Sequence, residues 1–175
     1  MPWGISNSAA WCTVAVAMQL AASLIPIDAA SAQQSQNRSW CNDPHSTDDQ
    51  TITGCTALIK SKRESKHNLV VDYTNRGVAH YNKHDYNSAI VDYNSALTLD
   101  PNFAPAYNAR CAARTAKGTY MIAIADCDVA IQIDPKYAYA YSNRGLAKQA
   151  NGDTAGGEAD IQRARELDPT IGSKP

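Results

Sequence analysis

The sequence predicts an all-α protein in which pairs of antiparallel helices stack side by side as a solenoid. The first supporting observation is a period of 34 residues, which tiles 70–103, 104–137 and 138–171 without insertion. The second is that apolar and small residues recur at helical spacing twice in each period, on either side of a turn. Because one such helix pair cannot bury its apolar face alone, the three pairs must stack on their neighbours.

The period is carried by residue types that return at fixed positions. Each repeat also closes with Asp-Pro, and the proline ends the second helix because it lacks the backbone N–H that a helix needs. The recurring residues are Tyr73, Tyr107 and Tyr141; Arg76, Arg110 and Arg144; Ala79, Ala113 and Ala147; Asp92, Asp126 and Asp160; Ala96, Ala130 and Ala164; and Leu99, Ile133 and Leu167.

Three motifs of the first repeat point to a family. They read Tyr73-x-Asn75-Arg76-Gly77-x-Ala79, then Asp85-Tyr86-x-x-Ala89-Ile90, then Ala96-Leu97-x-Leu99-Asp100-Pro101. With the period, they resemble the tetratricopeptide repeat (TPR). The resemblance covers 70–171 and implies a right-handed helix-turn-helix solenoid of three TPR units with an N-terminal capping helix. It also implies a non-enzymatic scaffold that binds a protein or peptide in a concave groove.

The later repeats depart from the family pattern. The second repeat has Cys111 where a small glycine is expected, and the third has Thr154, Gly157 and Glu158 where Tyr, Ala and Ile would pack. A glycine inside a helix costs about 1 kcal/mol relative to alanine. We therefore expect the last helix to be the weakest of the array.

A further helix is predicted over 48–61, ahead of the first repeat. Residues 47–50, Thr-Asp-Asp-Gln, resemble a capping box, and apolar residues follow at helical spacing. We expect this capping helix to pack on the first repeat like the second helix of a preceding one. Residues 60–67 form a polar connector, and 33–47 are expected to be a flexible mature N-terminus.

Residues 1–32 resemble a cleaved secretory signal peptide. The segment from Ala9 to Ile27 is mostly apolar, no charge precedes Asp28, and Ala30-Ser31-Ala32 supplies the small-x-small pattern of a cleavage site. Cleavage after Ala32 would place the protein in the periplasm or outside the cell, with no membrane insertion. The alternative is an uncleaved anchor, because 19 mostly apolar residues are long enough to span a bilayer.

Four of the five cysteines follow this segment, and an even number in an exported chain favours disulfides. A Cys41–Cys55 bond would hold residues 40–47 against the capping helix. Cys111 and Cys127 stand where the first repeat has a glycine and a tyrosine on facing helices, and this joint exchange predicts a bridge across the helix pair. Two unrelated thiols are the alternative for the first pair, and buried reduced thiols are the alternative for the second.

Composition and motifs exclude several functions. The 175 residues contain 16 Lys+Arg and 17 Asp+Glu, which does not suit a nucleic-acid binder that works by phosphate neutralisation. The chain lacks Gly-x-Ser-x-Gly, a P-loop and a dinucleotide fingerprint, so no catalytic residue and no cofactor are predicted. His80 and His84 have the spacing of metal ligands on a helix, but no second His or Cys pair lies near them, so no metal site is predicted. The repeated arginines and aspartates are interpreted as structural ion pairs between helices rather than as a ligand-binding ladder.

The resemblance places a peptide groove on the solvent-turned positions of the first helices. This groove would be uncharged, with amide and hydroxyl groups and two tyrosines, and would suit an extended or helical peptide. Its residues are Thr74, Asn75, Val78, Tyr81, Asn108, Ala112, Thr115, Tyr139, Ser142, Asn143, Leu146 and Gln149, and the same faces include Val71, Asn82, Pro105, Ala109, Ala116 and Ala150.

Chaperone-adaptor members of the family clamp a C-terminal carboxylate with Lys, Arg and Asn. Of the matching positions here, only Asn143 holds such a residue, so we do not expect that function; the positions are Thr74, Val78, Ala109, Tyr139 and Asn143.

The resulting hypothesis is a protein-interaction module of the cell envelope that binds a peptide. One alternative is an envelope assembly factor that binds a glycan or cell-wall fragment through Tyr81, Tyr139 and the amides. Another is a structural protein that associates with itself through the poorly capped third repeat.

Overall fold

A computed structural model describes residues 27–172, in which the chain forms α-helices and no strands. By contacts the chain divides into 1–36 and 37–175, and the second part contains the repeats. The described helices are α2 (Ile27–Asn42), α3 (Asp48–Ser61), α4 (Lys66–Asn82), α5 (Tyr86–Leu99), α6 (Ala104–Ala116), α7 (Tyr120–Ile133), α8 (Ala138–Ala150) and α9 (Thr154–Leu167).

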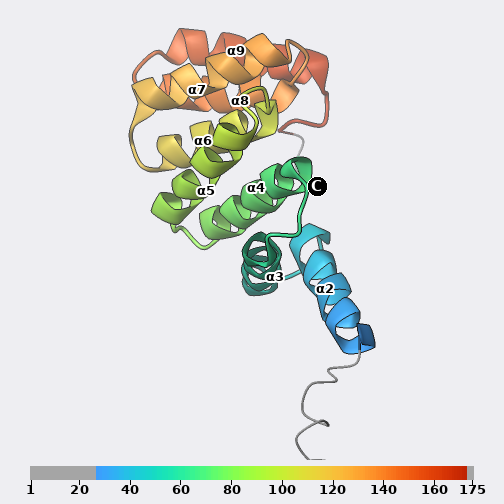
Figure 1. Ribbon diagram of the computed structural model, residues 1–175. Coiled ribbons are helices and arrows are strands. Elements are labelled where there is room, and N and C mark those ends of the chain that lie inside the picture. The colour runs from blue at the N-terminus through green and yellow to red at the C-terminus, as the bar shows by residue number, and fades with distance from the viewer. Residues whose placement is uncertain (1–26, 173–175) are drawn as a thin grey trace, which may run out of the picture. The chain divides into compact units, whose positions relative to one another are not determined.

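The three predicted repeats are the helix pairs α4–α5, α6–α7 and α8–α9. Figure 1 shows them stacked in chain order, from α4 in green to α9 in red. Alanines close the contacts between pairs: Ala104 of α6, Ala130 of α7 and Ala140 of α8 form one buried cluster. Small residues let the helix backbones approach closely. The stacked helix pairs confirm the predicted solenoid.

One residue in each turn between paired helices has the left-handed backbone conformation. Gly118 and Gly152 have φ of 79° and 96°, and in the first repeat His84 takes the same place with φ of 61°. Glycine adopts this conformation without a steric penalty, and the reversal it allows sets each second helix antiparallel to its first.

The capping helix predicted over 48–61 is α3, with those bounds. Thr47 accepts a hydrogen bond from the backbone N–H of Gln50, and the side chain of Gln50 accepts one from the N–H of Thr47. Arg76 of α4 donates to Thr56 of α3 at 3.1 Å, just as Arg110 donates to Asn94 of the preceding second helix. α3 therefore packs as the second helix of a preceding pair.

The expectation that residues 33–47 are flexible is wrong as far as Asn42, because α2 continues to that residue. Arg38 of α2 forms ion pairs with Glu64 and with Asp72, the latter at 2.7 Å. Cys41 of α2 is bonded to Cys55 of α3. These contacts hold the end of α2, and only a short turn separates it from α3.

The connector predicted over 60–67 is also shorter than expected. α3 extends to Ser61, and α4 begins at Lys66, where the side chain of Ser65 accepts a hydrogen bond from the N–H of Asn68. The apolar segment predicted as a signal peptide lies largely outside the described residues. None of the helices within 27–172 is both long and apolar enough to cross a membrane.

Candidate peptide-binding groove

The inner face of the solenoid is built from one side of α4, α6 and α8. Val78, Ala112 and Leu146 stand 34 residues apart and form a row across these three helices. Val78 is 42% exposed and Leu146 is 49% exposed, although both are large apolar residues. Tyr139 of α8, which is also a predicted groove residue, is 55% exposed. The face therefore presents apolar side chains to solvent.

A hollow of about 160 Å³ lies on this face and joins all three first helices. One of its lining residues comes from α4, three come from α6 and two come from α8. Every one of them is a position that the sequence placed on the groove side: Tyr81, Ala112, Thr115, Ala116, Asn143 and Leu146.

A second hollow, of about 250 Å³, lies where α4 meets the end of α2, the following turn and the start of α3. The amide of Asn75 donates to the carbonyl oxygen of Cys41 and to Oδ1 of Asn42, both at 3.1 Å. Asn82 donates to Oδ1 of Asp48 at 2.9 Å. The hollow is lined by Cys41, Asn42, Asp43, Pro44, Ser46, Asp48, Thr51, Asn75, Val78, Ala79 and Asn82.

Residues 41–51 contribute to this hollow, although the repeat period did not predict them as part of the groove. The signal that could have found it is the Cys41–Cys55 pair, because a bond between them places the residues after Cys41 beside α3 and hence beside α4. We treated that pair only as a tether for a flexible segment.

Thr74 was wrongly assigned to the groove. It is 8% exposed, and its hydroxyl donates to the carbonyl oxygen of Val70 at 2.7 Å, so the helix interior satisfies it. Gln149 of the predicted groove is partly buried. A Cβ on Gly157 of α9 would lie 2.4 Å from Cγ of Gln149, so the stem of Gln149 packs against α9.

Two predicted groove amides bond to each other rather than remaining open. Asn143 donates to Oδ1 of Asn108 at 2.8 Å, and Asn108 donates to the hydroxyl of Tyr137 at 3.3 Å. The remaining position, Ser142, is partly buried on α8. Amide groups therefore tie α6 to α8 along the floor of the groove.

The two groove tyrosines have different neighbours. Tyr81 packs against the buried Ala89, Tyr93 and Ala113, with its ring centroid 5.4 Å from that of Tyr86. Tyr139 lies beside Tyr137, with centroids 6.4 Å apart. Tyr81 lines the hollow of about 160 Å³ on this face, and Tyr139 does not.

The repeated arginines and aspartates form structural ion pairs, as predicted. Arg76 makes two bonds to Asp92, at 2.9 and 2.6 Å, and the later repeats do the same. Each guanidinium also lies over a tyrosine of its own helix, 5.3–5.5 Å from the ring centroid. The bond to Asp92 raises the pKa of Arg76 above its ordinary value. These arginines are held by the scaffold and are not available to a ligand.

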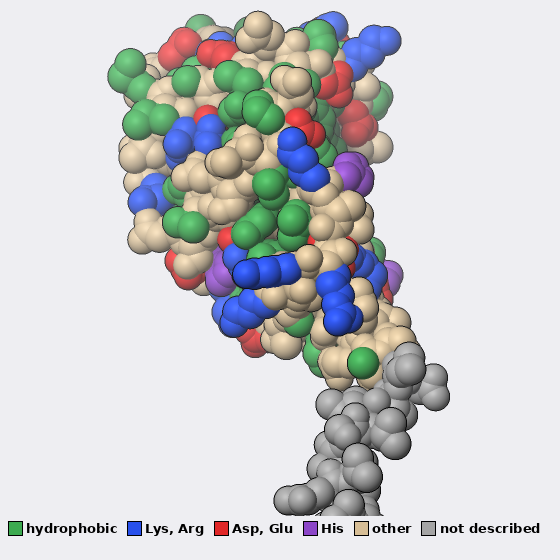
Figure 2. Space-filling view, in the orientation of Figure 1, with side chains coloured by type: hydrophobic (Ala, Val, Ile, Leu, Met, Phe, Trp, Pro, Cys, Tyr) green, Lys and Arg blue, Asp and Glu red, His purple; other side chains and the backbone are tan. Residues whose placement is uncertain are grey.

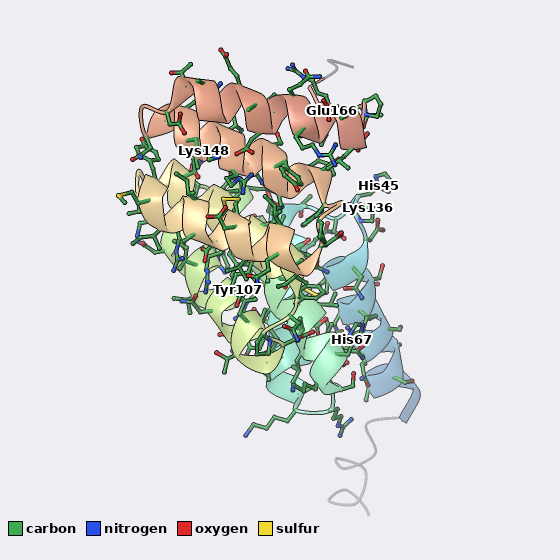
Figure 3. The ribbon with its side chains drawn as sticks, turned by 90° about the horizontal axis from the view of Figure 1, so that it is seen from above. His45, His67, Tyr107, Lys136, Lys148 and Glu166 are labelled. Atoms are coloured by element: carbon green, nitrogen blue, oxygen red, sulfur yellow. A yellow bond between two sulfur atoms is a disulfide. The ribbon has the colours of Figure 1, made fainter. Side chains whose placement is uncertain are left out.

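The histidines have separate surroundings. His80 lies 3.8 Å from Asp85 and 4.0 Å from Asp92, whereas Nδ1 of His84 lies 2.9 Å from the hydroxyl of Tyr86. His45 and His67, labelled in Figure 3, lie on separate segments. No group of three His, Cys, Asp or Glu side chains suited to a metal occurs in the part of the chain that the structure describes.

Both predicted cysteine pairs are bonded. Cys41–Cys55 joins α2 to α3, and Cys111–Cys127 joins α6 to α7, with Cα atoms 4.8 and 5.6 Å apart. In the first repeat the place of the second pair is taken by Gly77 against Tyr93, where a Cβ on the glycine would lie 2.5 Å from the ring. The two cysteines of the second repeat thus occupy the positions that a glycine and a tyrosine fill together in the first.

A sequence model of the tetratricopeptide repeat matches residues 71–103. The crystal structure of the Sgt2 TPR domain from Aspergillus fumigatus is 30% identical, with a TM-score of 0.57, and the match covers 60% of this chain and 70% of that one. The chain belongs to the tetratricopeptide-repeat family. No curated protein matches it in sequence.

Two further structures extend the comparison. The second TPR domain of human RPAP3, in complex with the HSP70 peptide SGPTIEEVD, is 26% identical, with a TM-score of 0.57 over 63% of this chain and 90% of that one. A crystal structure of MamA is 18% identical and shares the fold, with a TM-score of 0.64 over 90% of this TPR protein and 87% of MamA.

Proposed function

We propose that this TPR protein is a non-enzymatic interaction module of the cell envelope that binds a peptide segment of a partner protein on the inner face of α4, α6 and α8. One observation carries the proposal. Among the six large apolar residues that are exposed in the described part of the chain, three lie on this face: Val78, Tyr139 and Leu146. Exposed apolar side chains that line a hollow are typical of a surface that a partner covers.

The comparison with RPAP3 supports a peptide as ligand, because that TPR domain is in complex with one. Its peptide ends in Glu-Glu-Val-Asp and is acidic. The inner face of this chain has no lysine or arginine at the positions predicted for the groove, so the bound peptide is of a different kind. Figure 2 shows charged side chains of both signs scattered over the visible face, without a continuous field of one sign.

Two substitutions on opposite sides of the solenoid test the proposal. Leu146→Asp places a charge on the groove, and Ile122→Asp places one on an exposed apolar position of α7, where the residue is 55% exposed. Partners cross-linked in an envelope extract should be recovered with wild type and with Ile122→Asp but lost with Leu146→Asp. Recovery that is equal for all three proteins would reject the groove as the binding site.

Export is the second part of the proposal, and the residues around the predicted cleavage site support it. Ala30-Ser31-Ala32 supplies the small-x-small pattern of such a site, and these residues are exposed in the first part of α2. The protein from an envelope fraction should have an intact mass that begins at Gln33. A mass that retains residues 1–32, or a protein confined to the cytoplasm, would contradict cleavage and export.

The structure favours neither alternative function. A glycan would need aromatic faces brought together, but Tyr81 lies beside Tyr86 and Tyr139 lies beside Tyr137. Self-association through the third repeat would need an apolar outer face on α9. Position 165 holds an exposed arginine where the earlier repeats have Leu97 and Ile131 in their packed contacts, so the face carries charge instead.

A further inference from the structure

The hollow between α4 and residues 41–51 differs in charge from the rest of the groove. It contains two carboxylates, Asp43 and Asp48, and no lysine or arginine. No ion pair among the described residues includes either of them. The nearby Lys83 bonds to Asp49 at 2.6 Å; it interacts with Asp48 only at longer range and does not line the hollow.

The wall that carries these carboxylates is held in place from several sides. The Cys41–Cys55 bond fixes its start, and the capping box at Thr47 fixes its end. Asn75 and Asn82 of α4 bond directly to it. A wall that is ordered before the ligand arrives costs less conformational entropy on binding.

This hollow is continuous with the apolar row of the groove through Val78. That residue lines the hollow, and it begins the row that passes through Ala112 to Leu146, both of which line the smaller hollow. One bound segment can therefore contact the apolar row and the acidic hollow together.

We propose that the groove selects a peptide in which apolar side chains cover this row and one lysine or arginine side chain enters the hollow beside Asp43 and Asp48. The inference rests on the proposed function, which it makes specific. A cation there meets two carboxylates, whereas an acidic side chain would meet them with no lysine or arginine on the lining to offset the repulsion. The selected peptide is thus opposite in charge to the acidic peptide in the RPAP3 complex.

The test is a selection from a random nine-residue display library on four proteins: wild type, the double variant Asp43→Asn with Asp48→Asn, Leu146→Asp and the control Asp134→Asn. Wild type should enrich peptides that combine apolar residues with lysine or arginine. The double variant should enrich apolar peptides without that basic preference. Asp134→Asn is the matched control, because Asp134 accepts the N–H two residues ahead, as Asp43 does, but does not line the hollow.

A second measurement avoids any variant that alters folding. One selected peptide and its Lys→Gln counterpart are titrated onto the wild-type protein, and the glutamine peptide should bind about fivefold more weakly, the effect of one partly exposed ion pair. Added salt should weaken the lysine peptide and leave the glutamine peptide almost unchanged.

The outcomes separate the two proposals. Peptides that depend on Leu146 but show no basic preference, or an unchanged preference in the double variant, would overturn this inference alone. Equal enrichment by wild type and by Leu146→Asp would overturn the peptide groove itself.

Discussion

Asp72 is fully buried on α4, and its Oδ2 has no hydrogen-bond partner among the described residues. Oδ1 accepts a bond from Arg38 at 2.7 Å, and Glu64 contacts the same guanidinium, so two carboxylates share one arginine. Burial raises the pKa of Asp72 to about 6; Arg38 lowers it and Glu64 raises it further. The end of α2 is thus attached through a carboxyl group that takes up a proton in mildly acidic solution.

The raised pKa of Asp72 predicts a pH dependence of stability. Because the folded pKa lies above the ordinary value of 3.8, protonation stabilises the folded state, fully at low pH and progressively less as the pH rises through about 6. Relative to Asp72→Asn, the wild-type free energy of unfolding should fall by up to about 3 kcal/mol between about pH 4 and about pH 7. Denaturant titrations of both proteins at several pH values measure this difference.

Asp160 provides a contrast of opposite sign. Burial opposes its ionisation, but bonds from Arg144 and Lys148 outweigh it and lower the pKa of Asp160. Its contribution to stability should therefore be present above its ordinary pKa and disappear as the pH falls.

The prediction for Asp72 has its own contradicting result. A difference in the free energy of unfolding between wild type and Asp72→Asn that does not change with pH would show that the pKa of Asp72 is not raised.

At the scale of the helix, the repeats could be predicted and the N-terminal pair only in part. α4 to α9 repeat one pattern three times, so each position was seen in three contexts. α3 was found from its capping box and apolar spacing. α2 has few large apolar residues, and tertiary contacts of Arg38 and Cys41 hold its end, which no local pattern reveals. Thr74 was misplaced because its hydroxyl bonds within its own helix.

Ala130 tests the helix register that the period predicted. It is completely buried among Ala104 and Ala140, where α6, α7 and α8 meet, so a larger side chain has no space. Ala130→Leu should lower the free energy of unfolding by about 1–3 kcal/mol. Ala125→Leu on the exposed side of the same helix is the control and should change it little. Equal denaturation midpoints for the two variants would mean that the register is wrong.

The Cys111–Cys127 bond closes a loop within one helix pair. Both residues are fully buried, packed with Ala123 and Ala147. Replacing both with alanine should cost about 3 kcal/mol without reductant, by the chain-entropy estimate. With reductant, wild type and variant should melt at nearly the same temperature, since both then lack this crosslink. The same loss in both buffers would indicate packing of the sulfur atoms without a bond.

At the scale of the whole repeat array, the same arginine connects successive pairs. Arg144 bonds to Asp160 within its own pair and to Asp128 of the pair before it, at 2.7 Å. Arg110 and Arg76 repeat this arrangement toward α3. Second helices and buried ion pairs therefore form the scaffold, and one side of each first helix remains for a partner. The 34-residue period predicted this side of the first helices. The acidic hollow at its end depends on the turn that follows α2, which lies outside the period.

Hydrogen exchange of the protein with and without a library-selected peptide tests the central claim, that the inner face binds a partner segment. Protection should increase in α4, α6 and α8 and stay unchanged in α5, α7 and α9, and Leu146→Asp should abolish the change. Protection that falls mainly on α5, α7 and α9, or that persists in Leu146→Asp, would contradict the account.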